Sequence, residues 1–195
     1  MAWTDLRLLV AASLFFLGAG CSADKTEVVL DTELGEIRVE LYPKQAPATT
    51  ANFLTLVKEG VYDDALFYRV VRPDNQAGSP VKIQVVQGGL YQDSLIDLYP
   101  GIVHEHSGIT GIRHLDGTFS MARNEPGTAS TEFFICIDDQ PSLDFGGKRN
   151  PDGQGFAAFG KVTRGMELVR DIQQMQDTGQ YLVAPVRIRA IRPAK

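Results

Sequence analysis

The chain has 195 residues, of which 44% are hydrophobic and 22% are charged, and its formal net charge at pH 7 is −5. This size and composition are those of one globular domain with an adequate apolar core. Nucleic-acid binding is not expected, because phosphate contacts need clustered Lys and Arg and the sequence has no long basic run. No apolar stretch after residue 25 reaches the length needed to cross a bilayer.

Residues 1–20 are predicted to be a secretory signal peptide. An apolar run over residues 8–17 follows a basic residue and ends in three small residues before Cys21. The segment resembles a bacterial lipoprotein signal, in which the cysteine becomes the lipidated first residue of the mature chain. That pattern has Leu three residues before the cysteine, whereas here Gly18 holds this position and Leu17 precedes it. Ordinary cleavage to a soluble exported protein is the alternative.

Residues 21–26 are predicted to form a polar tether, and residues 27–195 a single domain without internal repeats. The chain has two cysteines, Cys21 and Cys136. Cys136 lies in an apolar strand pattern and is expected to be a buried core thiol. Lipidation of Cys21 would therefore leave one inert thiol, at Cys136, and no cysteine that needs a disulfide partner.

Short segments with alternating apolar residues, or rich in β-branched and aromatic residues, are predicted to be strands. Helical spacing covers residues 47–59, where Pro47 suits the first turn and Gly60 a C-terminal stop. It recurs over residues 165–175. Many short strands with only two helices predict a β-barrel or a β-sandwich. The predicted strands cover residues 27–31, 36–42, 65–71, 81–87, 118–122, 132–137, 156–162 and 186–191.

All three histidines fall in a long glycine-containing loop over residues 89–117. His104 and His106 are two residues apart, and Asp116 follows, so a metal site is conceivable. The side chains of His104 and His106 would point the same way only in an extended loop, and the sequence has no further histidine besides His114. We therefore expect a solvated loop and no metal.

Four short motifs place isolated polar groups among apolar residues with strand spacing. Arg69 stands between Phe67 and Val71 in the first motif, so a regular strand would aim its guanidinium along an apolar wall. Gln87 stands before two glycines in the second. A fixed cation in an apolar wall suits a site that grips a peptide by its backbone and one apolar side chain. The motifs cover residues 67–71, 85–89, 119–123 and 130–135.

These motifs, with the run at residues 159–162, resemble the cyclophilins, a family of peptidyl-prolyl cis-trans isomerases, in the order of that family. The resemblance runs from Val28 to Ile191. It implies a mainly β fold, a closed eight-stranded barrel capped by a helix at each end. It also implies isomerisation of X-Pro bonds without a cofactor. Against the family spacing, residues 72–81 and 144–155 are insertions.

The resemblance also implies the role of each site residue. Arg69 would donate a hydrogen bond to the prolyl nitrogen, which suits a side chain that is always charged and planar. Gln87 would support the arginine, and Phe134 would form the floor of the proline pocket. Taken alone, the same residues could be a surface arginine, a turn residue and plain core. The remaining substrate-binding positions are Val85, Leu143 and Phe156 in the pocket wall, Ala122 and Arg123 through their backbone, and Glu132.

Several positions depart from the family pattern. Ser142 stands where well-known cyclophilins have a Trp that helps to bind cyclosporin, so sensitivity to this drug is open. Phe156 replaces a histidine, and the residues before Val85 also differ. Glu132 replaces a glutamine, and a carboxylate cannot donate a hydrogen bond. We expect Glu132 to lie close to Arg69, where opposite charges would favour both ionised forms.

The sequence thus predicts a monomeric, exported isomerase that acts on proline-containing unfolded or flexible polypeptides. It would face the periplasm and be held at the membrane by a lipid on Cys21, at the outer membrane in a Gram-negative host. A proline-peptide binding module or holdase with weak turnover is the alternative, motivated by Glu132 and the altered pocket wall. A structural envelope lipoprotein would show neither binding nor turnover.

Overall fold

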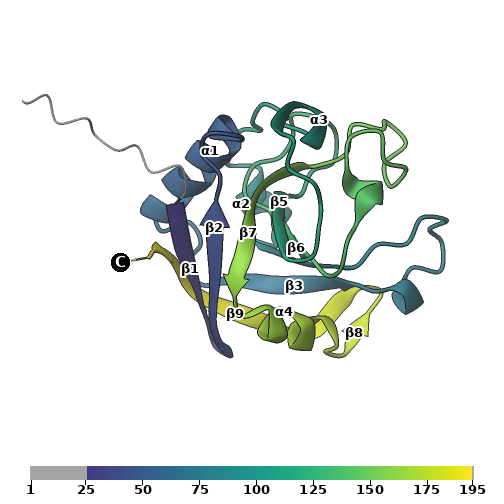
Figure 1. Ribbon diagram of the computed structural model, residues 1–195. Helices are drawn as coiled ribbons and strands as arrows, with labels where there is room; N and C mark the ends of the chain where they lie inside the picture. Colours follow the sequence, from purple (N-terminus) through teal and green to yellow (C-terminus); the bar gives the residue numbers. More distant parts are fainter. Residues whose placement is uncertain (1–25, 195) are drawn as a thin grey trace, which may run out of the picture.

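A computed structural model describes residues 26–194 (Figure 1). The predicted signal peptide and the predicted lipidation site at Cys21 lie outside these residues. The strands form one antiparallel sheet that curves into a barrel, and the connections between them run over its surface. The strands are β1 (Thr26–Thr32), β2 (Gly35–Leu41), β3 (Ala65–Val71), β4 (Val85–Gly89), β5 (Thr118–Met121), β6 (Phe133–Cys136), β7 (Ala157–Arg164), β8 (Asp177–Thr178) and β9 (Tyr181–Pro193).

The barrel closes where β1 pairs with β9, with Val29 opposite Arg192 and Leu30 opposite Ile191. The order around it is β1-β2-β7-β5-β6-β4-β3-β9, and β8 extends the sheet outside the closed ring by pairing with β9. Closure leaves no unpaired edge along the ring. The expected closed eight-stranded barrel is confirmed.

The barrel interior is filled by aromatic rings that come from different strands and from the helix after β2. Phe53 packs edge-on against Phe119 at 5.3 Å between ring centroids, and Phe119 lies 4.9 Å from Phe133. Phe133 is fully buried, while its neighbour Phe134 belongs to a second, smaller apolar cluster. The alternation of side chains along β6 therefore separates the barrel core from what lies outside it.

Two longer helices lie near opposite ends of the barrel, α1 (Pro47–Lys58) and α4 (Met166–Gln173) (Figure 1). Pro47 begins α1 and Gly60, at φ +72°, follows its end, as the sequence predicts. The first turn of α1 has no capping side chain of its own. Instead the Glu105 carboxylate accepts hydrogen bonds from the amides of Ala48 and Thr49, which ties the long loop to the helix.

Several parts of the chain differ from the sequence-based expectation, among them β8 and the first residues of β9, which the sequence does not predict to be strands. Residues 81–84 do not extend β4, because the Gln76 side chain bonds the amide and the carbonyl of Ile83 and takes the place of strand partners. The loop at 89–117 carries two single-turn helices, α2 (Asp93–Ile96) and α3 (Ser107–Thr110). Short 3-10 turns lie at Pro73–Asn75 and Pro141–Leu143.

No helix within residues 26–194 combines the length and apolar character that a membrane span requires.

Candidate active site

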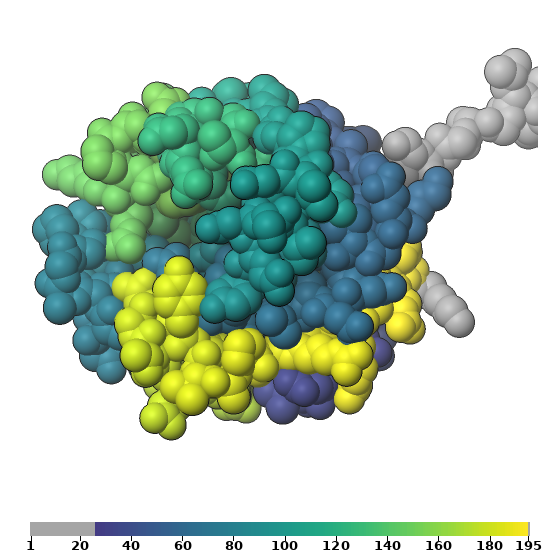
Figure 2. All heavy atoms as spheres, turned by 180° about the vertical axis from the view of Figure 1, so that it is seen from behind, coloured from purple at the N-terminus to yellow at the C-terminus, as the bar shows by residue number. Residues whose placement is uncertain are grey.

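A cavity of about 960 Å³ opens on the outer face of the barrel beside β3, β4 and β6. In Figure 2 the surface is hollowed between the yellow β8–β9 hairpin, the teal connection after β4 and the green connection before β7. Arg69, Gln87 and Phe134, which the motifs singled out, all line this cavity. The barrel thus gathers residues that are far apart in the sequence.

One half of the cavity is an apolar pocket built on neighbouring strands. Val85 from β4 and Phe134 from β6 are 3% and 4% exposed, and Leu143 from the turn before β7 is 1% exposed. Phe156 stands edge-on to Phe134, with 5.3 Å between ring centroids. The sequence-predicted pocket residues therefore lie together; Val71, Ile83, Cys136 and Ala122 complete the cluster.

The Arg123 side chain supports this pocket from behind. Its guanidinium lies 5.2 Å from the centroid of the Phe156 ring, bonds the carbonyl of Gly155 and pairs with Asp152. The side chain is only 1% exposed. The family resemblance implies a role for Arg123 through its backbone, and the structure adds one for its side chain, because a buried cation that stacks on Phe156 fixes that ring.

Ala122 lies beside the same pocket, but its amide donates to the carbonyl of Glu132 at 2.8 Å. This amide is used within the barrel, so a bound peptide would have to contact other backbone groups of this segment.

The His114 side chain is not solvated but packs against Phe134 of the pocket. Its ring is fully buried and stacks on Phe134 at 5.9 Å between centroids. Its two ring nitrogens contact Asp144 at 2.8 Å and Ser120 at 3.0 Å. Burial acts to raise the pKa of Asp144, but hydrogen bonds from the ring and amide of His114 hold that pKa below its usual value. The prediction of a solvated histidine is wrong here.

The other half of the cavity is polar and begins at a bulge in β3. Phe67 lies opposite Gly88 and Arg69 lies opposite Gln87, so Tyr68 is an extra residue in the strand. Phe67 therefore remains in the barrel core, while Tyr68 and Arg69 both line the cavity. A bulge of this kind redirects a side chain at a functional site. The expected shared face of Phe67 and Arg69 is not observed.

Two glutamines from distant parts of the chain, Gln87 and Gln180, bond the Arg69 guanidinium. Nη1 donates to Oε1 of Gln87 at 2.8 Å, while Nε and Nη2 donate to Oε1 of Gln180 at 3.1 and 2.6 Å. The contact with Gln87 agrees with the supporting role that the family resemblance implies. Arginine has five N–H donors, so one donor on each terminal nitrogen is left over from these three bonds.

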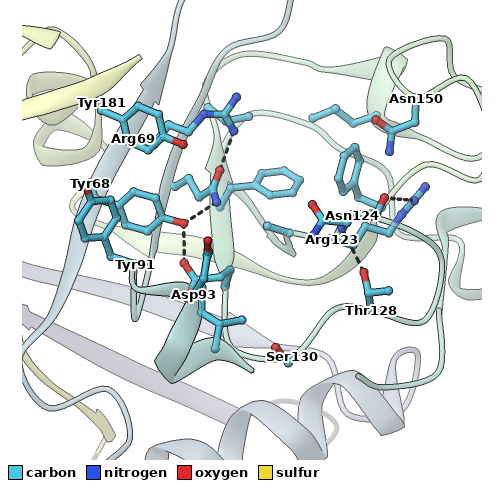
Figure 3. A pocket seen from close by; sticks show the side chains of 18 of the residues that line it. Tyr68, Arg69, Tyr91, Asp93, Arg123, Asn124, Thr128, Ser130, Asn150 and Tyr181 are labelled. Atoms are coloured by element: carbon cyan, nitrogen blue, oxygen red, sulfur yellow. Dashed lines mark hydrogen bonds between the residues drawn. The ribbon is translucent and has the colours of Figure 1, made fainter. Parts of the chain in front are cut away.

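Contrary to the expectation, Glu132 does not bond Arg69 directly. Its carboxylate accepts hydrogen bonds from the Tyr68 hydroxyl at 2.5 Å and from the Leu90 amide at 2.7 Å, and it makes no ion pair with Arg69. The Tyr68 hydroxyl in turn accepts a bond from Gln87 at 2.6 Å, so Tyr68 and Gln87 connect Glu132 to Arg69 (Figure 3). The expected direct pairing of Glu132 with Arg69 is therefore wrong.

Burial raises the pKa of the Glu132 carboxyl, although its hydrogen bonds, the one from Tyr68 foremost, act to lower it. Burial, together with the neighbouring carboxylate, likewise raises the pKa of Tyr68. Gly89 makes this arrangement possible, because a side chain at that position would collide with the Glu132 carboxylate. Glu132 does not bond Arg69, so withdrawal of the arginine by this carboxylate, one of the reasons for a weakly active binding module, is not observed.

Figure 3 shows labelled side chains on two sides of the cavity. Tyr68, Arg69, Tyr91 and Tyr181 lie on one side, and Arg123, Asn124 and Asn150 lie on the other. The ring centroid of Tyr68 lies 4.8 Å from that of Tyr91 and 6.4 Å from that of Tyr181.

Sequence reasoning missed Tyr68, Tyr91, Tyr181 and Gln180. The alternation of β3 could have placed Tyr68 outside the core, but Gln180 is 111 residues from Arg69 and carries no local signal.

The family model described as "Cyclophilin type peptidyl-prolyl cis-trans isomerase/CLD" matches residues 27–192. The chain belongs to this cyclophilin family. It is a peptidyl-prolyl cis-trans isomerase, as the motifs around Arg69, Gln87 and Phe134 predicted.

Two bacterial relatives resemble the chain over most of its length. Peptidyl-prolyl cis-trans isomerase A of Dickeya dadantii is 32% identical over 92% of this chain and 89% of its own. The cyp18 isomerase of Streptomyces antibioticus is 33% identical over 86% of this chain and 96% of its own.

Solved cyclophilins share the fold. A cyclophilin-type isomerase of Cryptosporidium parvum has a TM-score of 0.69 at 21% identity, and the match covers 88% of this chain and 98% of that one. A second structure of that protein, in the presence of the dipeptide Ala-Pro, also gives a TM-score of 0.69 at 21% identity, over 87% of this chain and 99% of that one.

Proposed function

We propose that Arg69 and the apolar pocket around Phe134 together carry out the isomerisation. The pocket would hold the proline ring of a flexible polypeptide, and Arg69 would donate to the prolyl nitrogen. The observation that carries this proposal is a guanidinium held at the edge of an apolar pocket, with donors left over for a substrate.

The chemistry needs no nucleophile, because no bond is broken. The barrier of about 18–20 kcal/mol arises from the partial double-bond character of the amide C–N bond. Twisting this bond localises the lone pair on the prolyl nitrogen, so a fixed donor there binds the twisted amide more strongly than either planar form. Only such a difference in binding accelerates the reaction.

A substrate of this kind is supported by the Cryptosporidium parvum relative, whose structure was determined with Ala-Pro. The apolar pocket is lined by Val85, Phe134, Leu143 and Phe156, and it suits a ring without polar atoms. No cofactor is required by this mechanism.

The test is an NMR exchange measurement on an X-Pro peptide with the mature chain carrying Cys21→Ser. We expect Arg69→Ala to lower turnover at least about 100-fold while the fold is retained, since one preorganised donor is worth about that much. Arg164→Ala, which removes an exposed cation at the end of β7, is the control and should match the unmodified chain. Equal turnover in Arg69→Ala and the control would refute the mechanism.

We further propose that the chain is exported and held at the membrane by a lipid on Cys21, where it would act on exposed X-Pro segments of envelope proteins. The support is the sequence of residues 1–21 alone. Cys21→Ser should abolish incorporation of labelled fatty acid and move the protein from the membrane to the soluble fraction. Cys136→Ser, at a buried thiol, is the control that should remain membrane-bound. Equal membrane retention of all three forms would refute the anchor.

A further inference from the structure

The arginine of the site is bound by a residue that belongs to none of the motifs. Gln180 lies in the turn between β8 and β9, and its side-chain oxygen accepts from both Nε and Nη2 of Arg69. Gln87 occupies Nη1 on the other edge of the fork. A guanidinium with an acceptor on each edge keeps its plane and direction.

The orientation of the Gln180 amide is fixed at both ends. Its side-chain nitrogen donates to the carbonyl of Asn75 at 3.1 Å, so the oxygen must face Arg69. Its backbone amide donates to Asp177 at 2.9 Å, and its backbone carbonyl accepts from Val70 at 2.8 Å. These bonds hold the backbone of Gln180 in the left-handed conformation at φ +78°, which residues other than glycine seldom adopt. The turn is therefore braced against an unfavourable backbone geometry.

Residues of the insertion that follows β3 hold this turn in place through contacts with Asp177. Arg72 pairs with Asp177 and donates to the carbonyl of Gln173 at 2.6 Å. Asn75 donates to Asp177 at 3.1 Å. The side chains of Arg72 and Asp177 are 16% and 6% exposed, so this pair is largely shielded from water. The insertion thus connects the end of β3, which carries Arg69, to the turn that carries Gln180.

We propose that Gln180 is a positioning residue for Arg69, and that residues 72–75 of the insertion hold Gln180 in place through Asp177. The proposal rests on the proposed role of Arg69. A free arginine side chain loses substantial rotamer entropy when it is fixed in one geometry. Gln180 removes that loss before the substrate binds, because the guanidinium is already directed when the proline enters the pocket.

A purely structural role for Gln180 predicts different behaviour from a positioning role. If Gln180 only closes the β8–β9 turn, its loss lowers the free energy of unfolding and leaves turnover of the folded protein unchanged. If it positions Arg69, its loss lowers turnover while the peptide still binds, since the apolar pocket is untouched. Its effect must also vanish when Arg69 is absent, because the two residues then act as one unit.

The experiment uses Gln180→Met in the mature chain, which keeps the length of the side chain and removes the acceptor. Thr178→Ala is the matched control, because Thr178 is an exposed residue of the same hairpin. Both are measured by NMR exchange on a saturating X-Pro peptide, and peptide affinity is measured by titration. We expect Gln180→Met to lower the exchange rate about tenfold, with affinity unchanged within about twofold, and Thr178→Ala to change neither.

Two further measurements distinguish a positioning role from a purely structural one. The Nε–H signal of Arg69, assigned from its loss in Arg69→Lys, should be present in the unmodified chain and in Thr178→Ala and broadened in Gln180→Met. In the Arg69→Ala background, Gln180→Met should have no additional effect on exchange. If Gln180→Met does not fold, Gln180→Gly replaces it, because glycine adopts φ +78° without strain.

Unchanged exchange in Gln180→Met, with Arg69→Ala strongly impaired, would overturn the positioning role and leave the proposed mechanism standing. Full activity of Arg69→Ala would instead overturn the mechanism itself. An additional loss from Gln180→Met in the Arg69→Ala background would show that Gln180 acts independently of Arg69, which also overturns the proposal.

Discussion

The two halves of the cavity are built in different ways. The apolar half comes from adjacent strands whose alternating side chains point outward at Val85 and Phe134. The polar half depends on a bulge at Tyr68 and on hydrogen bonds between segments more than a hundred residues apart, such as Arg69 with Gln180. Packing between apolar side chains dominates the first half, whereas the second depends mainly on hydrogen bonds between its members.

The largest effect is expected where the apolar half is removed. Phe134→Ala deletes a ring that is 4% exposed and contacts both His114 and Phe156. We expect the free energy of unfolding to fall by about 3 kcal/mol or more, and peptide affinity to be lost, as measured by urea titration and NMR. Phe134→Leu should recover most of the stability. Full affinity in a folded Phe134→Ala protein would show that the proline ring binds elsewhere.

This contrast explains what the sequence could predict. The barrel strands follow from local alternation, which one strand carries by itself, whereas the residues of the apolar pocket are those that the family resemblance implies. The direction of Arg69 does not, because one extra residue at Tyr68 changes which face the following side chains occupy. Gln180 and the burial of His114 depend on distant partners, Arg69 and Asp144, that no local pattern reveals.

The next prediction tests the planar fork of the polar half. Arg69→Lys keeps the charge but offers a single ammonium in place of a fork that reaches both Gln87 and Gln180. We expect turnover to fall roughly 30-fold, or about 2 kcal/mol of barrier, with peptide affinity nearly unchanged. Turnover equal to that of the unmodified chain would show that charge alone is sufficient and that the two glutamines are not needed.

Tyr68→Phe should have a smaller effect, because it removes only the link between Gln87 and Glu132. A hydrogen bond to a charged group contributes about 1.5–3 kcal/mol, so we expect the free energy of unfolding to fall by up to about 2 kcal/mol. Turnover should fall only a few-fold, since Gln87 still bonds Arg69. Tyr181→Phe, at a half-exposed ring of the same cavity, is the control. Equal stability of the two variants would mean that Tyr68 does not support the carboxylate.

The smallest effect is expected at Glu132, the polar residue that is furthest from Arg69 in this network. Tyr68 and Leu90 bond different oxygens of the carboxylate, so Glu132→Gln removes the charge and keeps an acceptor for only one of the two. Because Glu132 reaches Arg69 only through Tyr68 and Gln87, turnover should change by less than about tenfold, or 1.4 kcal/mol of barrier. A gain far above tenfold would mean that the carboxylate draws Arg69 away from the substrate.

The pH dependence of stability gives a sharper test of the same residue. Burial raises the pKa of Glu132 in the folded protein, so the folded state holds this proton more tightly than the unfolded chain does. Its contribution to stability is therefore complete below the unfolded pKa and is lost as the pH rises through the folded pKa. An amide does not titrate, so the unfolding free energy of Glu132→Gln relative to the unmodified chain should increase over this interval and then level off. Thermal unfolding at a series of pH values measures this, with the exposed Glu125→Gln as the charge control. A relative stability that decreases with rising pH would show that hydrogen bonds from Tyr68 and Leu90 outweigh burial at this carboxyl.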